Sequence, residues 1–247
     1  MRTKRTPLKI MTIRLASILL CVGLFSSSAF SQTWDFRTWH KLKAGGKLTK
    51  DLSGFVEYQM RLEENSTRVN ETFTEVGLEY DLPKGFDVGA AYRLGWSPDR
   101  DNIYSSEHRY NVDLSYGKKF WKLEGKARVR FQHRPSASLY NERLEPDDSP
   151  MIVRFKAGIA YRKLKKLKPG FEFELFARTD LPEENGINRF RYKVFLDVDL
   201  PKRQELSVFY MLQTNYDQVT PAFLSIAGVS FSYEWKRPKR KKKKKDE

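Results

Sequence analysis

Apolar and polar side chains alternate along most of this chain. In WKLEGKARVRFQH, every second residue from Trp121 to His133 is apolar, small or aromatic, and the residues between them are charged or polar. This period of two predicts an extended strand with one apolar face and one charged face. The apolar face of such a strand meets a core in a soluble sandwich and lipid in a membrane barrel.

Eleven segments between Trp34 and Trp235 repeat this alternation. Short connections such as LTKDLS, DLPKGF and LPKRQE alternate with longer polar ones such as SPDRDNIYSSE and HRPSASLYNERLEPDDSP. Outer-membrane barrels have short periplasmic turns and longer extracellular loops. We therefore predict an all-β fold, an antiparallel transmembrane β-barrel with this arrangement of loops. Because single-chain bacterial barrels have even strand numbers, we expect about 10–12 strands and favour twelve over the eleven segments counted.

The alternative all-β fold is a soluble sandwich whose charged faces meet bulk water. The predicted strands are about ten residues long and carry Tyr, Trp and Phe at their ends, as the interface girdles of membrane barrels do. A mean hydropathy of −0.64 does not oppose a membrane location, because only alternate residues of a barrel strand face lipid. Strand length, girdles and the sorting of loops by length together favour the barrel.

Residues 1–31 have the pattern of a secretory signal peptide. Basic residues precede the apolar run LASILLCVGLF, and small residues follow it, with Ala29 and Ser31 at the expected cleavage positions. The apolar run is too short for a transmembrane helix. Cys21, the single cysteine, lies in this run after Leu20, which is not the small residue that a lipoprotein signal needs. We therefore predict an exported body, residues 32–235, without disulfides or thiolate metal sites.

A lysine-rich tail, residues 236–247, follows the body. The tail holds 9 of the 46 Lys and Arg residues and the leader holds 5, so the body itself has a formal charge of only +3. We expect no nucleic-acid partner, because an exported chain rarely meets chromosomal nucleic acid. A disordered periplasmic tail attracted to anionic lipid head groups, or to another anionic envelope polymer, agrees with this charge. A solvated tail without a dedicated partner is the alternative.

Several of the alternating segments resemble a known family. TWHKLKAGGKLTKDLSGFVEYQMRL, FTEVGLEYDLPKGFDVGAAYRL, EHRYNVDLSY, ARVRFQHR and NRFRYKVFLDVDLPKRQELSVFYMLQ are similar to domain-of-unknown-function family 2490. The resemblance covers nearly all of residues 32–235. It implies an outer-membrane β-barrel of the kind common in Bacteroidota, with no established activity and no catalytic residues. The lysine-rich extension departs from the usual pattern of the family.

The end of the predicted barrel resembles the C-terminal signal that the barrel-assembly machinery reads. The stretch GVSFSYEW supplies Gly228, Phe231, Tyr233 and Trp235. Such signals usually end the chain, whereas twelve residues follow Trp235 here. The resemblance implies the assembly machinery as a partner during export.

One pair of residues is a weak candidate for catalysis. Ser106 and His108 are two positions apart and share a strand face, as the nucleophile and base do in outer-membrane lipid hydrolases. Catalysis requires the two side chains within hydrogen-bond reach and a third group that orients the imidazole. Asn70 and Glu71 are the candidates for that third group. The alternative is that Ser106 begins a strand and His108 lies in an interfacial belt.

The predicted lumen faces carry charges of both signs. The main group comprises Lys122, Lys126, Arg128, Arg130, Arg154, Lys156, Glu57, Glu75, Glu79, Glu172 and Glu174. Charges inside a barrel must be paired or hydrated. A barrel of about twelve strands is intermediate between filled eight-stranded and aqueous sixteen-stranded barrels. We therefore expect either an occluded ion-pair network or a narrow polar pore, and the basic sixth and seventh segments would make such a pore favour anions.

These observations predict a non-enzymatic barrel surrounded by outer-membrane lipid, either structural or a narrow anion-favouring pore. A lipid-modifying hydrolase using Ser106 and His108 is one alternative, and a surface adhesin acting through the loop 133–150 is another. His40 and His133 are far apart and no ligand cluster has metal spacing, so we predict no metal and no cofactor. EPDDSP, residues 145–150, could attract a divalent cation but matches no calcium-loop template.

Overall fold

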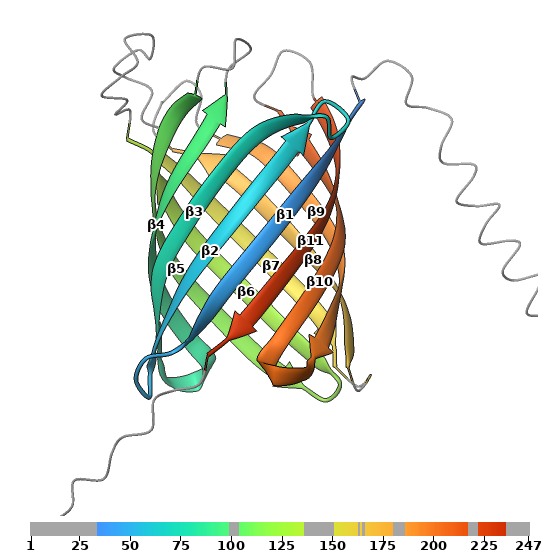
Figure 1. The fold of residues 1–247 in the computed structure, drawn as a ribbon. Coiled ribbons are helices and arrows are strands. Elements are labelled where there is room, and N and C mark those ends of the chain that lie inside the picture. The colour runs from blue at the N-terminus through green and yellow to red at the C-terminus, as the bar shows by residue number, and fades with distance from the viewer. Residues whose placement is uncertain are drawn as a thin grey trace, which may run out of the picture. The chain divides into compact units, whose positions relative to one another are not determined.

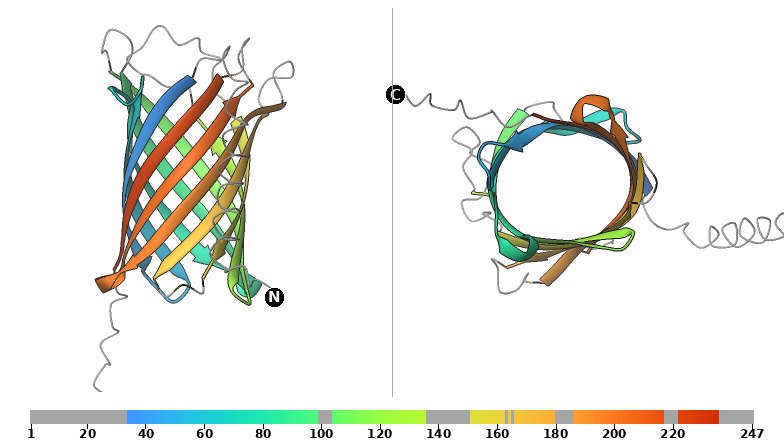
Figure 2. Two further views of the ribbon diagram at one scale, coloured as in Figure 1. Left: turned by 90° about the vertical axis from the view of Figure 1, so that its right-hand side faces the viewer. Right: turned by 90° about the horizontal axis from the view of Figure 1, so that it is seen from below.

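The computed structural model describes residues 34–98, 104–135, 151–162, 164, 166–179, 186–216 and 222–235. These residues form a closed barrel of eleven strands (Figure 1, Figure 2). The strands are β1 (Trp34–Lys47), β2 (Leu52–Glu63), β3 (Arg68–Asp81), β4 (Phe86–Pro98), β5 (Tyr104–Phe120), β6 (Leu123–His133), β7 (Met151–Tyr161), β8 (Leu167–Arg178), β9 (Gly186–Leu200), β10 (Gln204–Asn215) and β11 (Ala222–Glu234). The predicted signal peptide 1–31, the tail 236–247 and most of the loop 133–150 lie outside the described residues.

Neighbouring strands pair antiparallel, except at the seam, where β1 and β11 pair in parallel from Trp34–Phe223 to Gly45–Glu234. The prediction of a barrel with 10–12 strands is confirmed, whereas the preference for twelve is wrong. An even strand number is needed only when every pair is antiparallel, and one parallel pair allows an odd number. As a consequence, β1 begins at one rim of the barrel and β11 ends at the other (Figure 1).

The connections are sorted by rim. Residues 64–67, 99–103, 134–150, 179–185 and 216–221 join strand ends at the upper rim of Figure 1, which we call the long-loop rim. Residues 48–51, 82–85, 121–122, 162–166 and 201–203 join strand ends at the lower rim, which we call the short-turn rim. The predicted sorting therefore holds, although β2 and β3 extend so far that only residues 64–67 remain between them.

Two of the short turns have the same local structure. Pro83–Gly85 and Pro201–Arg203 each form a single 3-10 turn that begins with proline after leucine. Proline fixes its own φ in the range that such a turn needs, and the following lysine has a positive φ in both turns, 63° at Lys84 and 59° at Lys202. Among the described residues, no helix is long and apolar enough to cross a membrane.

The barrel has apolar side chains outside and charged side chains inside. Leu42, Val112 and Val194 are 58%, 51% and 54% exposed. Glu75 and Arg93, in contrast, are only 4% and 6% exposed. This is the reverse of a soluble protein, and it is the distribution of a strand wall between lipid and a polar lumen.

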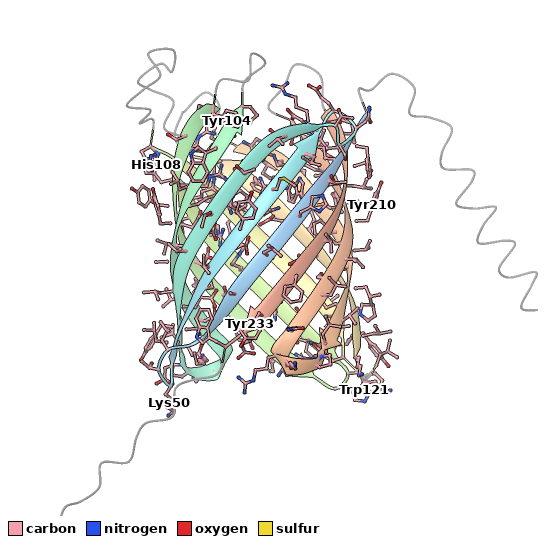
Figure 3. The ribbon with its side chains drawn as sticks, viewed as in Figure 1. Lys50, Tyr104, His108, Trp121, Tyr210 and Tyr233 are labelled. Carbon is pink, nitrogen blue, oxygen red and sulfur yellow. The ribbon has the colours of Figure 1, made fainter. Side chains whose placement is uncertain are left out.

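Aromatic residues lie near both rims of the outer surface. Tyr104 lies towards the long-loop rim, and Trp121 and Tyr233 lie towards the short-turn rim (Figure 3). Trp121 is 88% exposed and belongs, with Lys122, to the turn between β5 and β6. The expectation that Lys122 faces the lumen is therefore wrong, because β6 begins only at Leu123. The ammonium of Lys122 instead lies 4.0 Å from the centre of the Trp121 ring.

Three phenylalanine rings of the lumen face lie against the glycine that is directly opposite on a neighbouring strand. Phe55 is opposite Gly77, Phe195 opposite Gly170, and Phe209 opposite Gly228. A methyl group added at Gly77 would come within 2.6 Å of the Phe55 ring, and one added at Gly170 or Gly228 would overlap the ring beside it. Each glycine thus lets an aromatic ring lie flat against the barrel wall.

We expect Gly228→Ala to destabilise the barrel by about 1–3 kcal/mol, because the new methyl group would displace the Phe209 ring. Gly117→Ala is the matched control, since Gly117 also faces the lumen but a methyl group there meets only Lys126 Cγ at 4.0 Å. Urea unfolding of the reconstituted barrels measures both free energies. Equal stability of the Gly228→Ala and Gly117→Ala variants would show that the position of the Phe209 ring does not depend on Gly228.

Candidate functional site: the charged lumen

Bidentate and buried ion pairs join neighbouring strands at the middle of the lumen. The Arg93 Nε donates a hydrogen bond to Glu75 at 2.8 Å. Arg130 donates two hydrogen bonds to Asp113, both of 2.6 Å. Arg93 and Arg130 are each 6% exposed. The Arg130–Asp113 pair is fork-shaped, with one hydrogen bond to each carboxylate oxygen, and such bidentate pairs are among the strong hydrogen bonds between side chains.

Longer contacts connect these pairs into one network from β3 to β9. Glu75 lies 3.9 Å from Arg130, three strands away, and so links the two pairs across the wall. Glu174 of β8 is the second centre: Arg154 donates to it at 2.8 Å, and Arg128 lies 3.3 Å from it. Arg191 reaches the other oxygen of Glu174 at 3.6 Å. We call the eight residues that form this set the lumen network: Glu75, Arg93, Asp113, Arg128, Arg130, Arg154, Glu174 and Arg191.

Like charges lie directly opposite each other at six places in the strand ladder. These pairs are Glu57–Glu75, Asp81–Asp87, Arg93–Arg109, Arg128–Lys156, Arg130–Arg154 and Asp199–Glu205. Such pairs repel when isolated. Here each Arg–Arg or Arg–Lys pair lies between strands that supply carboxylates, as Asp113 and Glu174 do for Arg130 and Arg154. Arg130 and Arg154 are therefore each neutralised from the strand on their other side, and the Arg128–Glu174 contact skips one strand.

Aromatic rings fill the space between the guanidinium groups. The guanidinium carbon of Arg93 lies 3.6 Å from the centre of the Phe73 ring, and that of Arg154 lies 4.5 Å from the Phe176 ring. Phe73 and Phe176 are 0% and 4% exposed, so neither ring borders open space, and we call the level of these two rings the filled level. Arginine stacked on an aromatic face is favourable once both are desolvated.

The lumen also contains an apolar cluster beside the seam. Met211 of β10 and Leu224 and Ile226 of β11 are buried, with Trp39 and Phe209 packed against them. The sequence interpretation treated the lumen faces as charged and did not assign a role to these apolar residues. The sequence pattern does place them in the lumen, because each occupies the face that carries charges elsewhere on its strand.

Two continuous cavities lie on the short-turn side of the filled level. The larger one, which we call the vestibule, has a volume of about 860 Å³ and extends to Lys47, Arg162 and Arg203 at the short-turn rim. The smaller one, the central cavity, has a volume of about 350 Å³ and extends upward to Arg61, Arg93 and the rest of the network. Lys43, Lys156 and other residues line both. Phe73, Phe176, Leu224 and Ile226 line neither cavity.

Every predicted lumen residue except Lys122 lines one of these cavities. In the vestibule, Glu172 binds two cations, Lys156 at 3.4 Å and Lys193. Lys168 lies 2.6 Å from Asp199 and 3.2 Å from Glu205. Lys43 has no carboxylate partner among the described residues, and its ammonium lies 4.2 Å from the centre of the Phe55 ring. Both cavities are therefore polar, and their charges are mostly paired.

Of the candidate catalytic pair, His108 lies on the outer surface near the long-loop rim (Figure 3), and Ser106 is two positions before it on β5. Nδ1 of His108 is 2.7 Å from the hydroxyl of Tyr92, and no hydrogen bond joins Ser106 to His108 within the described part of the chain. Glu71 is not on their face, since it points into the lumen and binds Arg61 at 2.6 Å. Asn70 belongs to β3, which β4 separates from β5. The expected third group is thus absent from the side of Ser106 and His108 among these residues.

The remaining candidate residues are spread over the barrel. Gly228 faces the lumen, whereas Tyr233 is 44% exposed on the outer face with Phe231. The Trp235 N–H donates to the carbonyl of Gly45 at 2.8 Å, which fastens the end of β11 to β1. In the ranges that the structure describes, no group of three or more His, Cys, Asp or Glu side chains could hold a metal ion. EPDDSP lies outside these ranges.

We expect Glu174→Gln to lower the free energy of unfolding by about 3–5 kcal/mol, because it leaves Arg154, Arg191 and Arg128 without their shared buried counter-charge. Glu205→Gln is the control, since Glu205 is 38% exposed and its partner Lys168 keeps Asp199. The control should lose less than about 1 kcal/mol. Urea unfolding in lipid vesicles measures both, and a Glu174→Gln loss as small as that of the control would contradict a coupled network.

Comparisons with known proteins concern the fold and the family. The solved structure of the NanC porin is 12% identical, with a TM-score of 0.47, and the match covers 72% of this chain and 86% of the porin. The β domain of the Bordetella autotransporter BrkA is 11% identical, with a TM-score of 0.43, and the match covers 76% and 93%. Among curated proteins, none matches. The family model described as protein of unknown function (DUF2490) matches residues 36–222, from β1 to the first residue of β11, and the chain therefore belongs to this family.

Proposed function

We propose that this chain is a non-enzymatic outer-membrane barrel whose lumen is closed towards the long-loop rim and accessible from the short-turn rim. The observation that carries the proposal is the filled level of the lumen. Phe73 and Phe176 are buried among the guanidinium groups of the lumen network, and neither ring lines either cavity. Ions could cross the barrel without a conformational change only along a cavity that continues past these two rings.

The location in the membrane follows from the outer surface. Exposed apolar side chains surround the barrel between the two aromatic belts, and this surface is stable only against lipid. We place the short-turn rim and the tail 236–247 in the periplasm, because short turns are periplasmic in outer-membrane barrels. With this orientation the vestibule opens towards the periplasm.

The absence of an enzymatic role is part of the proposal. It is supported by the missing contact between Ser106 and His108 and by the bond that already occupies Nδ1 of His108. An adhesin role for the loop 133–150 depends on residues that lie mostly outside the described part of the chain.

A gated pore is the second candidate function, and one observation favours it. Ten cationic and seven acidic side chains line the central cavity, so any pathway opened through it would favour anions. Opening would require the two rings and the guanidinium groups stacked on them to move away from the middle of the lumen.

Conductance in a planar bilayer tests the closed lumen. The wild-type barrel should insert without conductance steps, whereas a Phe73→Ala/Phe176→Ala double variant should give discrete steps with an anion-favouring reversal potential, because it empties the filled level. The control variant Phe131→Ala/Phe155→Ala also removes two phenylalanine rings, but it removes them from the outer surface, where they are 57% and 48% exposed. This control should give no conductance steps. Steps from the wild-type barrel would contradict the proposal.

A further inference from the structure

Three residues that line the central cavity carry a buried hydrogen-bond donor without a partner among the described residues: Nε1 of Trp39, Nε of Arg61 and Nε of Arg128. Trp39 and Arg61 lie directly opposite each other on β1 and β2. Buried donors are rarely left without an acceptor, because each one loses its hydrogen bond to water. An acceptor that reached the nitrogens of Trp39 and Arg61 would satisfy both.

A third donor group lies beside them. The guanidinium carbon of Arg61 is 4.1 Å from the centre of the Trp39 ring, and that of Arg191 is 5.2 Å from it. Arg191 uses its Nε for Gln213 at 2.7 Å and contacts Glu174 only at 3.6 Å. Arg191 therefore retains donor capacity, since a guanidinium carries five N–H groups. Two positive charges and an indole N–H meet at one place on the wall.

The carboxylates near Trp39 do not neutralise the positive charges of Arg61 and Arg191. Arg61 donates to Glu71 at 2.6 Å through one terminal nitrogen. Glu71 does not line the central cavity, and Glu174 is shared with Arg154 and Arg128. Over its whole lining the cavity has ten cationic against seven acidic side chains. The local excess of positive charge favours an anion with several acceptor oxygens.

We propose that Trp39, Arg61 and Arg191 form a binding site for a small oxyanion, such as a phosphate, sulfate or carboxylate group. The anion would accept hydrogen bonds from Nε1 of Trp39 and Nε of Arg61, and Arg191 would supply a further donor. Met211, buried against Trp39, gives the site an apolar side. The central cavity, at about 350 Å³, is large enough for a small organic acid as well as an inorganic ion.

Access to the site is through the vestibule. Lys41, Lys43 and Lys193 line both cavities and form a basic path from the short-turn rim to the site. This route rests on the proposed one-ended lumen, and it means that the anion enters and leaves on the same side. The barrel would then hold its ligand on the periplasmic side of the closed level and would not conduct it.

Inorganic phosphate, added to the full-length exported protein in detergent micelles, tests the site. In nuclear magnetic resonance spectra, the indole N–H resonance of Trp39, assigned by its loss in Trp39→Phe, should move with phosphate until it saturates. Calorimetry should give an affinity that falls about tenfold in Trp39→Phe, which removes one hydrogen bond to a charged group and keeps a ring. A saturating shift of this one resonance is not expected from diffuse attraction between charges.

Two charge-matched variants separate the site from the general charge of the lumen. Arg61→Gln should abolish measurable binding, whereas Lys126→Gln, which removes one positive charge from a vestibule residue whose side chain is 72% exposed, should leave the affinity nearly unchanged. An equal loss of phosphate affinity in both variants, or an indole resonance that phosphate does not move, would overturn the inference. The two donors would then be hydrated by water.

Conductance of the same preparation keeps the two proposals distinct. A conducting barrel that binds phosphate refutes only the closed lumen, and a silent barrel that does not bind refutes only the site.

Discussion

The structure depends on one constraint: a charge enclosed by a ring of strands must find its counter-charge inside the ring. The outer face of the wall is apolar, so it offers no counter-charge to a charged side chain of the lumen. At six positions the adjacent strand offers the same sign, as where Arg130 lies opposite Arg154. The neutralising group then comes from the strand on the other side, as Asp113 of β5 does for Arg130, and Glu174 binds residues of β6, β7 and β9. This sharing of carboxylates joins the separate ion pairs into one network.

Phenylalanine side chains of the lumen occupy two settings. The rings of Phe73 and Phe176 are buried among guanidinium groups. The rings of Phe55, Phe195 and Phe209 lie against glycines directly opposite them and line the vestibule. Phe73 is also opposite a glycine, Gly95, so the glycine alone does not decide which setting a ring takes.

Much of the fold was predictable, because alternation with a period of two survives in nearly every strand. The eleven segments, the sorting of connections and the inward direction of Glu75, Arg130 and Arg154 could all be predicted from residue types alone. The strand number was misjudged because the parallel β1–β11 seam leaves no trace in the alternation. Lys122 was misplaced because alternation does not reveal where a strand gives way to a turn. The Trp39–Arg61 site was missed because it depends on two donors whose hydrogen bonds only coordinates can count.

The most direct test of the one-ended lumen is the side from which a cysteine in the vestibule can be labelled. The only cysteine of the chain is Cys21, in the predicted signal peptide, so Ser207→Cys, in the vestibule wall, introduces a unique thiol into the exported protein. A membrane-impermeant thiol reagent is applied to barrels reconstituted in one orientation. The account predicts labelling when the reagent is on the side of the short-turn rim and none when it is on the side of the long-loop rim. Equal labelling from both sides would contradict it.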